Sequence, residues 1–317
     1  GQDARWPESP RRGDDLFAPR FPLRKIVVQI DADLAVPARV SPHPVSLAEL
    51  LSDLLGHDLV ERYLYSDDGP PPGLKSMPGT DDTFEGWVVA GPYDDAGGYK
   101  YATYSPDGEC LVKSSLWSNG GDLAALEEEE AYSELGPTDG AARRRRDWLA
   151  AHVASRALGA DLYVTKRPYL LALPVERTRG TVVCNPEDAL AVLGLYFRAQ
   201  GLYLVTRVER FDRDGYFAVG SRELLPQSWR WSAAGVQATE GDIGSLTHSL
   251  LARVASALEA RDGVHMAAMR TAADDRGQNV LFHVDAAVLL LHAAVDVAAR
   301  VAHRVLGLSG SERDASW

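Results

Sequence analysis

One stretch, from Arg143 to Ala172, constrains the fold more than any other part of the chain. It reads RRRRDWLAAHVASRALGADLYVTKRPYLLA. Apolar residues recur at three- and four-residue steps after the arginines, which predicts a helix with one apolar face, and Gly159 stands where a C-cap glycine is expected. Residues 161 to 165 predict a short covered strand, which Pro168 ends. A helix, a tight loop and a buried strand predict a crossover in an α/β sheet, where ligands bind beyond the carboxyl ends of the strands.

Length and composition limit the class of protein. With 317 residues and 45% hydrophobic content, the chain can bury one large core or two modest ones. A formal charge of −12 argues against a protein that coats nucleic acid generally, but it allows a local basic patch. The two cysteines, Cys110 and Cys184, are too few for a disulfide framework or a four-thiolate zinc site, so a reducing compartment is expected.

The hydropathy pattern gives no expectation of a membrane partner. The first residues lack the apolar run of a signal peptide, and the apolar stretch from Val280 to Leu291 is short and carries His283 and Asp285. We therefore expect a soluble, cytoplasmic protein.

The order of patterns predicts two folded parts. We expect a flexible arm over residues 1–24, an α/β domain over 25–208, a connector over 209–242, a helical bundle over 243–308 and a tail over 309–317. The α/β domain should be a three-layer α/β/α structure on a mostly parallel sheet, with an antiparallel β meander inserted at about 84–118. The helical part holds two long apolar-faced helices, which predicts either a small bundle or a homodimer interface within 243–308.

Carboxylates follow the first predicted strand, Lys25 to Ile30. Asp31 and Asp33 are two residues apart, so in an extended chain they point the same way and could share a hard divalent cation. The alternative is that they solvate the end of the strand.

A basic run precedes the helix of the opening stretch. Arg143, Arg144, Arg145 and Arg146 stand at the expected helix N-terminus, where cations oppose the macrodipole. The resulting loss of helix stability is understandable if the arginines bind an anion, either the acidic run Glu127 to Glu130 or a phosphate backbone.

Three places in the first 200 residues resemble the PIN-domain family of metal-dependent ribonucleases. KIVVQIDAD resembles the family's first strand, which ends in an aspartate, here Asp31. DWLAAHVASRALGADLYVT resembles the segment in which an aspartate, here Asp147, opens a helix that leads to a strand ending Val-Thr. TVVCNPEDALAVL resembles the last strand and closing helix. The resemblance covers about residues 25 to 200, and it implies Mg²⁺ or Mn²⁺ held by Asp31 and Asp147, with RNA as substrate.

The chain departs from the family pattern after Val-Thr. The family usually supplies another acidic residue there, whereas this chain has Lys166 and Arg167. Two-metal hydrolysis needs several carboxylates. Either Asp161 or one of Glu127 to Glu130 compensates, or the chain is a binding-only relative that grips nucleic acid or a nucleotide through Arg143 to Arg146 and these two cations.

The C-terminal helices resemble HEPN domains, whose nucleases use an arginine and a histidine four to six residues apart. Arg276 and His283 enclose six residues. The resemblance implies metal-free RNA cleavage, with His283 in acid–base work and Arg276 stabilising the phosphorane charge. A partly buried helical histidine is the alternative.

Three functions follow from these patterns. The first is a ribonuclease of toxin or phage-defence type, with Asp31 and Asp147 holding the metal. The second is a binding or regulatory module with a degenerate site. The third is an interaction protein that dimerises through its C-terminal helices.

Overall fold

The computed structural model describes residues 24–35, 46–66, 86–92, 99–105, 109–116, 147–172, 180–237, 243–268 and 273–311. Residues 1–23 of the predicted arm, Glu127 to Glu130, and Arg143 to Arg146 lie outside the described residues. The chain divides into two compact units. The first comprises residues 1–196 and 206–208, and the second comprises residues 197–205 and 209–317.

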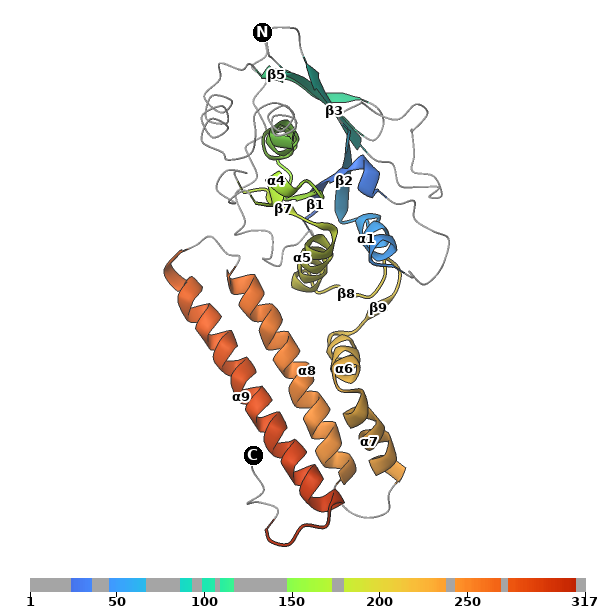
Figure 1. Cartoon of the computed structure of the whole chain (residues 1–317), viewed down its shortest axis with the longest axis vertical. Coiled ribbons are helices and arrows are strands. Elements are labelled where there is room, and N and C mark those ends of the chain that lie inside the picture. The colour runs from blue at the N-terminus through green and yellow to red at the C-terminus, as the bar shows by residue number, and fades with distance from the viewer. Residues whose placement is uncertain are drawn as a thin grey trace. The chain divides into compact units, whose positions relative to one another are not determined.

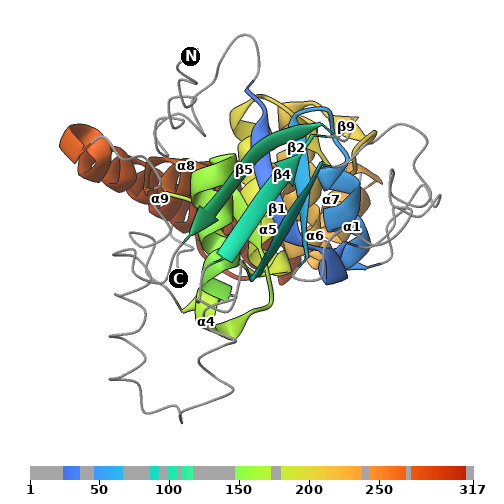
Figure 2. The same cartoon turned by 90° about the horizontal axis from the view of Figure 1, so that it is seen from above.

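A seven-stranded sheet forms the centre of the first unit, in the order β5-β4-β3-β2-β1-β6-β7. Five neighbouring strands, β3, β2, β1, β6 and β7, are parallel, and β4 and β5 continue the sheet in antiparallel fashion (Figures 1 and 2). The bounds are β1 (Ile26–Asp31), β2 (Val60–Ser66), β3 (Gly86–Pro92), β4 (Tyr99–Tyr104), β5 (Cys110–Leu116), β6 (Leu162–Val164) and β7 (Val182–Cys184).

The predicted fold class is confirmed: a mostly parallel α/β sheet is followed by a helical region. The predicted meander at about 84–118 corresponds to β3, β4 and β5. It is an extension of the main sheet, because β3 pairs in parallel with β2 before the chain turns back into β4.

Helices lie on both faces of this sheet. Helix α1 (Leu47–Leu55) begins after Ser46, whose hydroxyl accepts a hydrogen bond from the Glu49 amide. It lies with α5 (Pro186–Ala199) on one side of the central strands, and a helix spanning residues 147–158 lies on the other (Figure 1). The second half of that helix is π-helical (η2, Val153–Leu158), and it ends at Gly159 in the left-handed conformation, with φ of 59°.

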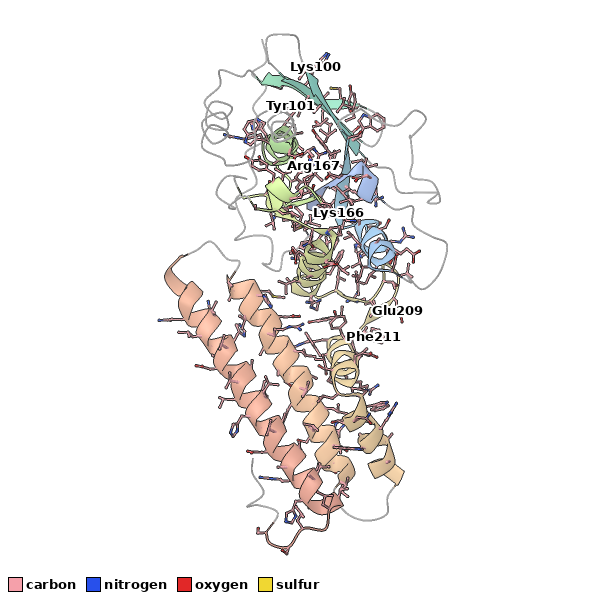
Figure 3. The ribbon with its side chains drawn as sticks, viewed as in Figure 1. Lys100, Tyr101, Lys166, Arg167, Glu209 and Phe211 are labelled. Atoms are coloured by element: carbon pink, nitrogen blue, oxygen red, sulfur yellow. The ribbon has the colours of Figure 1, made fainter. Side chains whose placement is uncertain are left out.

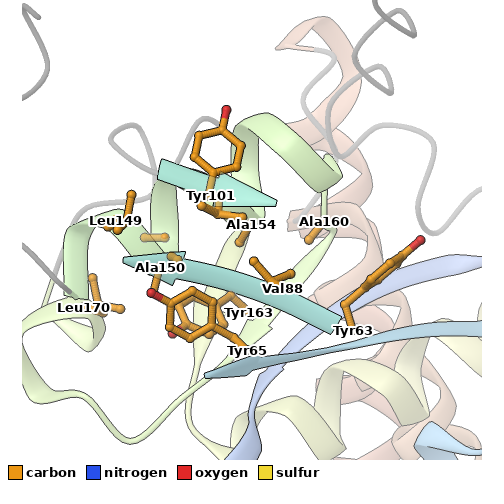
Figure 4. Close-up of a cluster of buried hydrophobic side chains, with 13 residues drawn as sticks. Tyr63, Tyr65, Val88, Tyr101, Leu149, Ala150, Ala154, Ala160, Tyr163 and Leu170 are labelled. Carbon is orange, nitrogen blue, oxygen red and sulfur yellow. The ribbon is translucent and has the colours of Figure 1, made fainter. Parts of the chain in front are cut away.

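A hydrophobic core lies between helix 147–158 and the sheet. Small helix residues pack against aromatic rings from three strands, β2, β4 and β6, and against Val88 of β3 (Figure 4). Side chains alternate along β1, so Gln29 faces this helix and donates a hydrogen bond from Nε2 to the Ala150 carbonyl. Asp31, two residues later, faces the same way. The principal members of the cluster are Tyr63, Tyr65, Val88, Tyr101, Leu149, Ala150, Val153, Ala154 and Tyr163.

The second unit is helical apart from a small hairpin. Its elements are β8 (Tyr203–Leu204), β9 (Arg210–Phe211), α6 (Arg213–Leu224), α7 (Pro226–Gln237), α8 (Ile243–Ala268) and α9 (Ala273–Val305). Helices α6 and α7 thus occupy most of the stretch that the sequence leaves as a connector.

Trp229 and Trp231, whose alternation could have marked a strand face, lie in α7, and both are exposed. The buried positions of α7 are instead Ser228 and Ser232, one helical turn apart. The alternation of the two tryptophans thus does not mark a strand.

Helix α9 buries a different face from the one that its largest apolar residues predict. Ala294 and Val297 pack against Leu250 and Val254 of α8. Leu281 and other large apolar side chains on the first half of α9 are exposed. Small residues allow the two long helices to approach closely, which explains why the smaller face is the one that is buried.

The same helix contains the described segment Gly277–Val305, which is long and apolar enough to cross a membrane by length and composition. Only 11% of its apolar window is buried. The sequence pattern did not predict a stretch of this length. Length and composition alone are weak evidence for a membrane span.

Candidate ligand-binding site at the carboxyl ends of β1 and β6

The candidate site lies where the strand order reverses. β1 has β2 on one side and β6 on the other, and all three run in parallel. Ile30 is paired with Val164, so Asp31 and Thr165 emerge next to each other at the carboxyl edge of the sheet. In open α/β sheets, ligands bind in the crevice at this topological switch point.

Asp31 is buried and receives hydrogen bonds from three side chains. The Tyr163 hydroxyl donates to Oδ1 at 2.6 Å, and the Thr165 hydroxyl donates to Oδ2 at 2.6 Å. Arg167 donates from Nε to the same Oδ2 at 3.2 Å. The alternation along β6 places Tyr163 and Thr165 on one face, and it is this spacing that brings both hydroxyls to a single carboxylate.

Arg167 joins Asp31 to Asp147. Its Nη1 donates to Oδ1 of Asp147 at 2.8 Å, while its Nε contacts Asp31. The two aspartates come from β1 and from helix 147–158, far apart in sequence, and they meet on one guanidinium group. The guanidinium carbon of Arg167, Cζ, lies 5.4 Å from the centre of the Tyr65 ring, which adds a cation–π contact. The backbone amide of Arg167 donates to the Thr165 hydroxyl at 3.1 Å, so the loop after β6 is itself held in place.

Burial dominates the electrostatics of the cluster. It raises the pKa of Asp31 from its ordinary value, although the Arg167 charge and the hydrogen bonds from Thr165 and Tyr163 oppose the rise. Burial also raises the pKa of Tyr163 well above its ordinary value, and the neighbouring Asp31 charge adds to the effect. Tyr163 is therefore a permanently protonated donor to Asp31 at neutral pH.

The arrangement does not fit a divalent metal held by Asp31 and Asp147. A guanidinium group already lies between these carboxylates, and Asp31 accepts three hydrogen bonds, which leaves it little capacity for a metal ligand. In the part of the chain that the structure describes, no group of three or more His, Cys, Asp or Glu side chains is placed to hold a metal ion.

Asp33 and Asp161 do not join Asp31. After Asp31 the chain turns into a 3-10 helix (η1, Ala32–Leu34) in which Asp33 is exposed, so the alternation of an extended chain no longer applies. Asp161 precedes β6 and lies at the opposite edge of the sheet. It accepts hydrogen bonds from Arg24 at 2.6 Å and from the Val27 amide at 3.0 Å. The expectation that Asp161 compensates for the missing metal ligand is thus not supported by its position.

Two of the predicted nucleic-acid-binding residues occupy the loop between β6 and α4 (Pro168–Leu171), as Figure 3 shows. The Lys166 side chain is exposed, whereas 20% of the Arg167 side chain is accessible. Arg143 to Arg146 lie outside the described residues. In the sequence they immediately precede Asp147.

The HEPN-like pair lies in the second unit. His283 is half-buried on α9 and approaches Gly263 of α8 so closely that a Cβ atom there would lie 2.4 Å from Nδ1 of the imidazole. Arg276 belongs to the first turns of α9, but its side chain lies outside the described set. The catalytic role of this pair stays a prediction.

Sequence reasoning missed the two hydroxyl donors of the site and the buried Gln29. Tyr163 and Thr165 alternate in a strand parallel to β1, a signal that becomes readable once the pairing of β1 with β6 is known. Gln29 is fully buried, and its Oε1 has no hydrogen-bond partner among the described atoms.

Comparison with known proteins identifies no relative: no family model, no curated protein and no solved structure matches the chain.

Proposed function

We propose that this chain is a PIN-like protein that binds RNA at the carboxyl edge of its sheet and does not cleave it by metal-dependent hydrolysis. The observation that carries the proposal is the Arg167 guanidinium, hydrogen-bonded to both Asp31 and Asp147. These are the two carboxylates that the family resemblance assigns to the metal. RNA as partner would place the protein in the cytoplasm.

Local charge supports an anionic ligand. Lys166 is exposed on the loop after β6, and Arg146 is covalently joined to Asp147. In the sequence, Arg143 to Arg146 directly precede the helix that begins at Asp147. A cluster of Lys and Arg side chains binds a phosphate backbone by releasing its counterions, even on a protein of negative net charge. Within the site itself, the single positive charge of Arg167 balances only one of the two aspartate charges. Arg167 therefore holds the two carboxylates together and leaves no excess positive charge for RNA.

The ribonuclease alternative requires the site to rearrange. Arg167 would have to leave both carboxylates before they could hold Mg²⁺ or Mn²⁺, and removing a cation from two buried carboxylates is costly. For this reason we favour binding over hydrolysis.

The test is fluorescence anisotropy with a labelled single-stranded RNA of about 20 nucleotides, in EDTA and in Mg²⁺, at several salt concentrations. We expect binding that needs no divalent cation and weakens with salt. Lys166→Ala should weaken it about three- to tenfold and reduce the salt slope by about one. Changing Arg143 to Arg146 together to Ala should weaken it further. Arg230→Ala, which removes an exposed cation from α7, is the matched control and should bind as wild type.

Two outcomes would overturn the proposal. Equal binding by all the variants, or no binding at all, would mean that this edge does not hold RNA. Cleavage of the RNA in Mg²⁺ that Asp147→Asn abolishes would establish the ribonuclease instead.

A further inference from the structure

Helix α9 presents an exposed apolar seam that is separate from its contact with α8. Large aliphatic side chains on this seam are 37% to 62% exposed. Their spacing alternates between four and three residues, which is the a/d spacing of a heptad repeat. We call the set Leu281, Val284, Val288, Leu291 and Val295 the α9 seam.

The contact with α8 uses another side of the helix. Ala294, Val297 and Val301 are buried, and the first two belong to the core shared with α8. The α9 seam therefore has no covering element among the described residues. A contiguous exposed apolar surface of this kind marks an interaction site.

A second copy of the chain is the occupant that the seam fits best when the two α9 helices run antiparallel. If Val288 of one copy lies opposite Leu291 of the other, then Val284 lies opposite Val295. Each layer then joins an a position to a d position, and Leu281 lies opposite Ala298, which also packs against the core shared with α8. The twofold symmetry of such a dimer repeats every layer.

Polar side chains next to the seam also match in the same register. Asp285 and His292 are exposed, and they directly follow the seam residues Val284 and Leu291, so they occupy equivalent positions of successive heptads. In the antiparallel pair, Asp285 of each copy comes within roughly 3 Å, along the helix axis, of His292 of the other. Within its own chain, His292 also lies 3.9 Å from Asp296. A carboxylate and an imidazole are thus brought together twice across the dimer.

A lipid bilayer fits this surface less well, even though α9 passes the length test. Asp285 lies on the exposed side, 78% of the His292 side chain is accessible, and so is 39% of that of Asp296. Each charged group placed at the centre of a bilayer costs about 3 kcal/mol or more. Two α8–α9 hairpins, by contrast, make a four-helix bundle.

We propose that two copies of this chain associate through the α9 seams in antiparallel orientation. This interface is independent of the RNA-binding edge, because it uses residues of the second unit alone.

Sedimentation velocity of the full chain over a range of concentrations tests the association. We expect wild type to be a dimer, and we expect Val288→Asp to weaken the dimerisation constant about 100-fold or more, because the twofold axis buries the new charge twice. Leu289→Asp is the matched control: Leu289 is the next residue, is 69% exposed and lies off the seam. It should dimerise as wild type. A monomeric wild type, or equal loss in both variants, would overturn the proposal.

Cysteine cross-linking in a Cys110→Ser background tests the orientation. In the antiparallel register, a cysteine at Val288 lies about 4.5 Å along the axis from its counterpart, whereas cysteines at Leu281 lie about 25 Å apart. We expect a disulfide-linked dimer from Val288→Cys and none from Leu281→Cys. Cross-linking at both positions would contradict the antiparallel arrangement. Binding of wild type to phosphatidylcholine vesicles, lost in both Val288→Asp and Leu289→Asp, would assign the surface to a membrane.

Discussion

Arg167 holds two buried carboxylates with one planar group. Nε contacts Asp31 and Nη1 contacts Asp147, so the fork of the guanidinium fits a pair of acceptors that a lysine ammonium, a single point charge, could not bridge in the same way. If Arg167 were truncated, both aspartates would stay buried without this cation.

We therefore expect Arg167→Ala to lower the free energy of unfolding by about 3 kcal/mol, the usual cost of removing one partner from a buried ion pair. Urea unfolding followed by circular dichroism measures this difference. Lys166→Ala, at the neighbouring exposed cation, should stay within about 0.5 kcal/mol of wild type. Equal effects of the two substitutions would contradict the bridging role of Arg167.

The coupling between Arg167 and Asp147 can be isolated by a double-mutant cycle. Asp147→Asn removes the charge that Arg167 neutralises, so the double variant should lose less stability than the sum of the two single variants, by about 1 kcal/mol or more. Strict additivity in the same urea experiment would mean that the 2.8 Å contact is not maintained in solution.

The sequence allowed several residues of the site around Asp31 to be named, but not the contacts between them. Asp31 could be named from its place at a strand end, whereas Asp147 was named only through the resemblance to the PIN-domain family, which also marked Arg167 as a cation where the family has a carboxylate. The partners of Arg167 depend on the pairing of β1 with β6, which are about 130 residues apart, and no local pattern encodes that pairing. Asp33 was misplaced because a single turn of 3-10 helix breaks the alternation on which the expectation depended.

Among the elements, α8 and α9 depend on one glycine for their close approach. Gly263 leaves room for the His283 ring, and an added Cβ would lie 2.4 Å from Nδ1. Gly277, on the exposed start of α9, has no atom within 4 Å of the corresponding position. The two helical glycines therefore have opposite roles in stability.

Gly263→Ala should destabilise the protein by about 1–3 kcal/mol through overpacking. Gly277→Ala should instead stabilise it by about 0.5–1 kcal/mol through helix propensity. Thermal or urea unfolding measures both. Adding His283→Ala should remove the penalty of Gly263→Ala; a penalty that persists in that background would show that His283 is not the residue that clashes.

The reactivity of the Cys184 thiol tests whether β7 is buried. Burial raises its pKa to about 12, so hardly any thiolate forms at pH 8. Cys110, at the start of β5, is exposed. We expect a disulfide reagent at pH 8 to label Cys110 rapidly and Cys184 only as fast as the protein unfolds. Rapid labelling of both thiols in native protein would contradict the burial of β7.

The apolar face of α9 shows where element prediction stops. The heptad of large residues correctly indicated a long helix, but it could not show that smaller residues on another side would take the contact with α8. Which of two apolar faces is buried depends on the shape of the partner helix. The same limit applies to Trp229 and Trp231, whose alternation is compatible with a strand although they lie in α7.

For the whole molecule, the division into an α/β unit and a helical unit separates two functions. The proposed RNA site uses the carboxyl edge of the sheet, and the proposed dimer interface uses α9. The order of α/β and helical patterns along the chain was enough to predict both parts. The net charge of −12 neither predicts nor excludes a local basic patch, because it averages charge over the whole chain.

In the proposed function, Arg167 lies between Asp31 and Asp147 where the family resemblance implies a metal ion. Mn²⁺ titration followed by electron paramagnetic resonance tests it most directly, with wild type, Arg167→Ala and Arg167→Ala/Asp147→Asn compared at neutral pH. We predict no Mn²⁺ binding by wild type in the micromolar range, binding by Arg167→Ala through the freed carboxylates, and its loss in the double variant. Micromolar binding by wild type that Asp147→Asn abolishes would show instead that Asp31 and Asp147 hold a metal ion in the native protein.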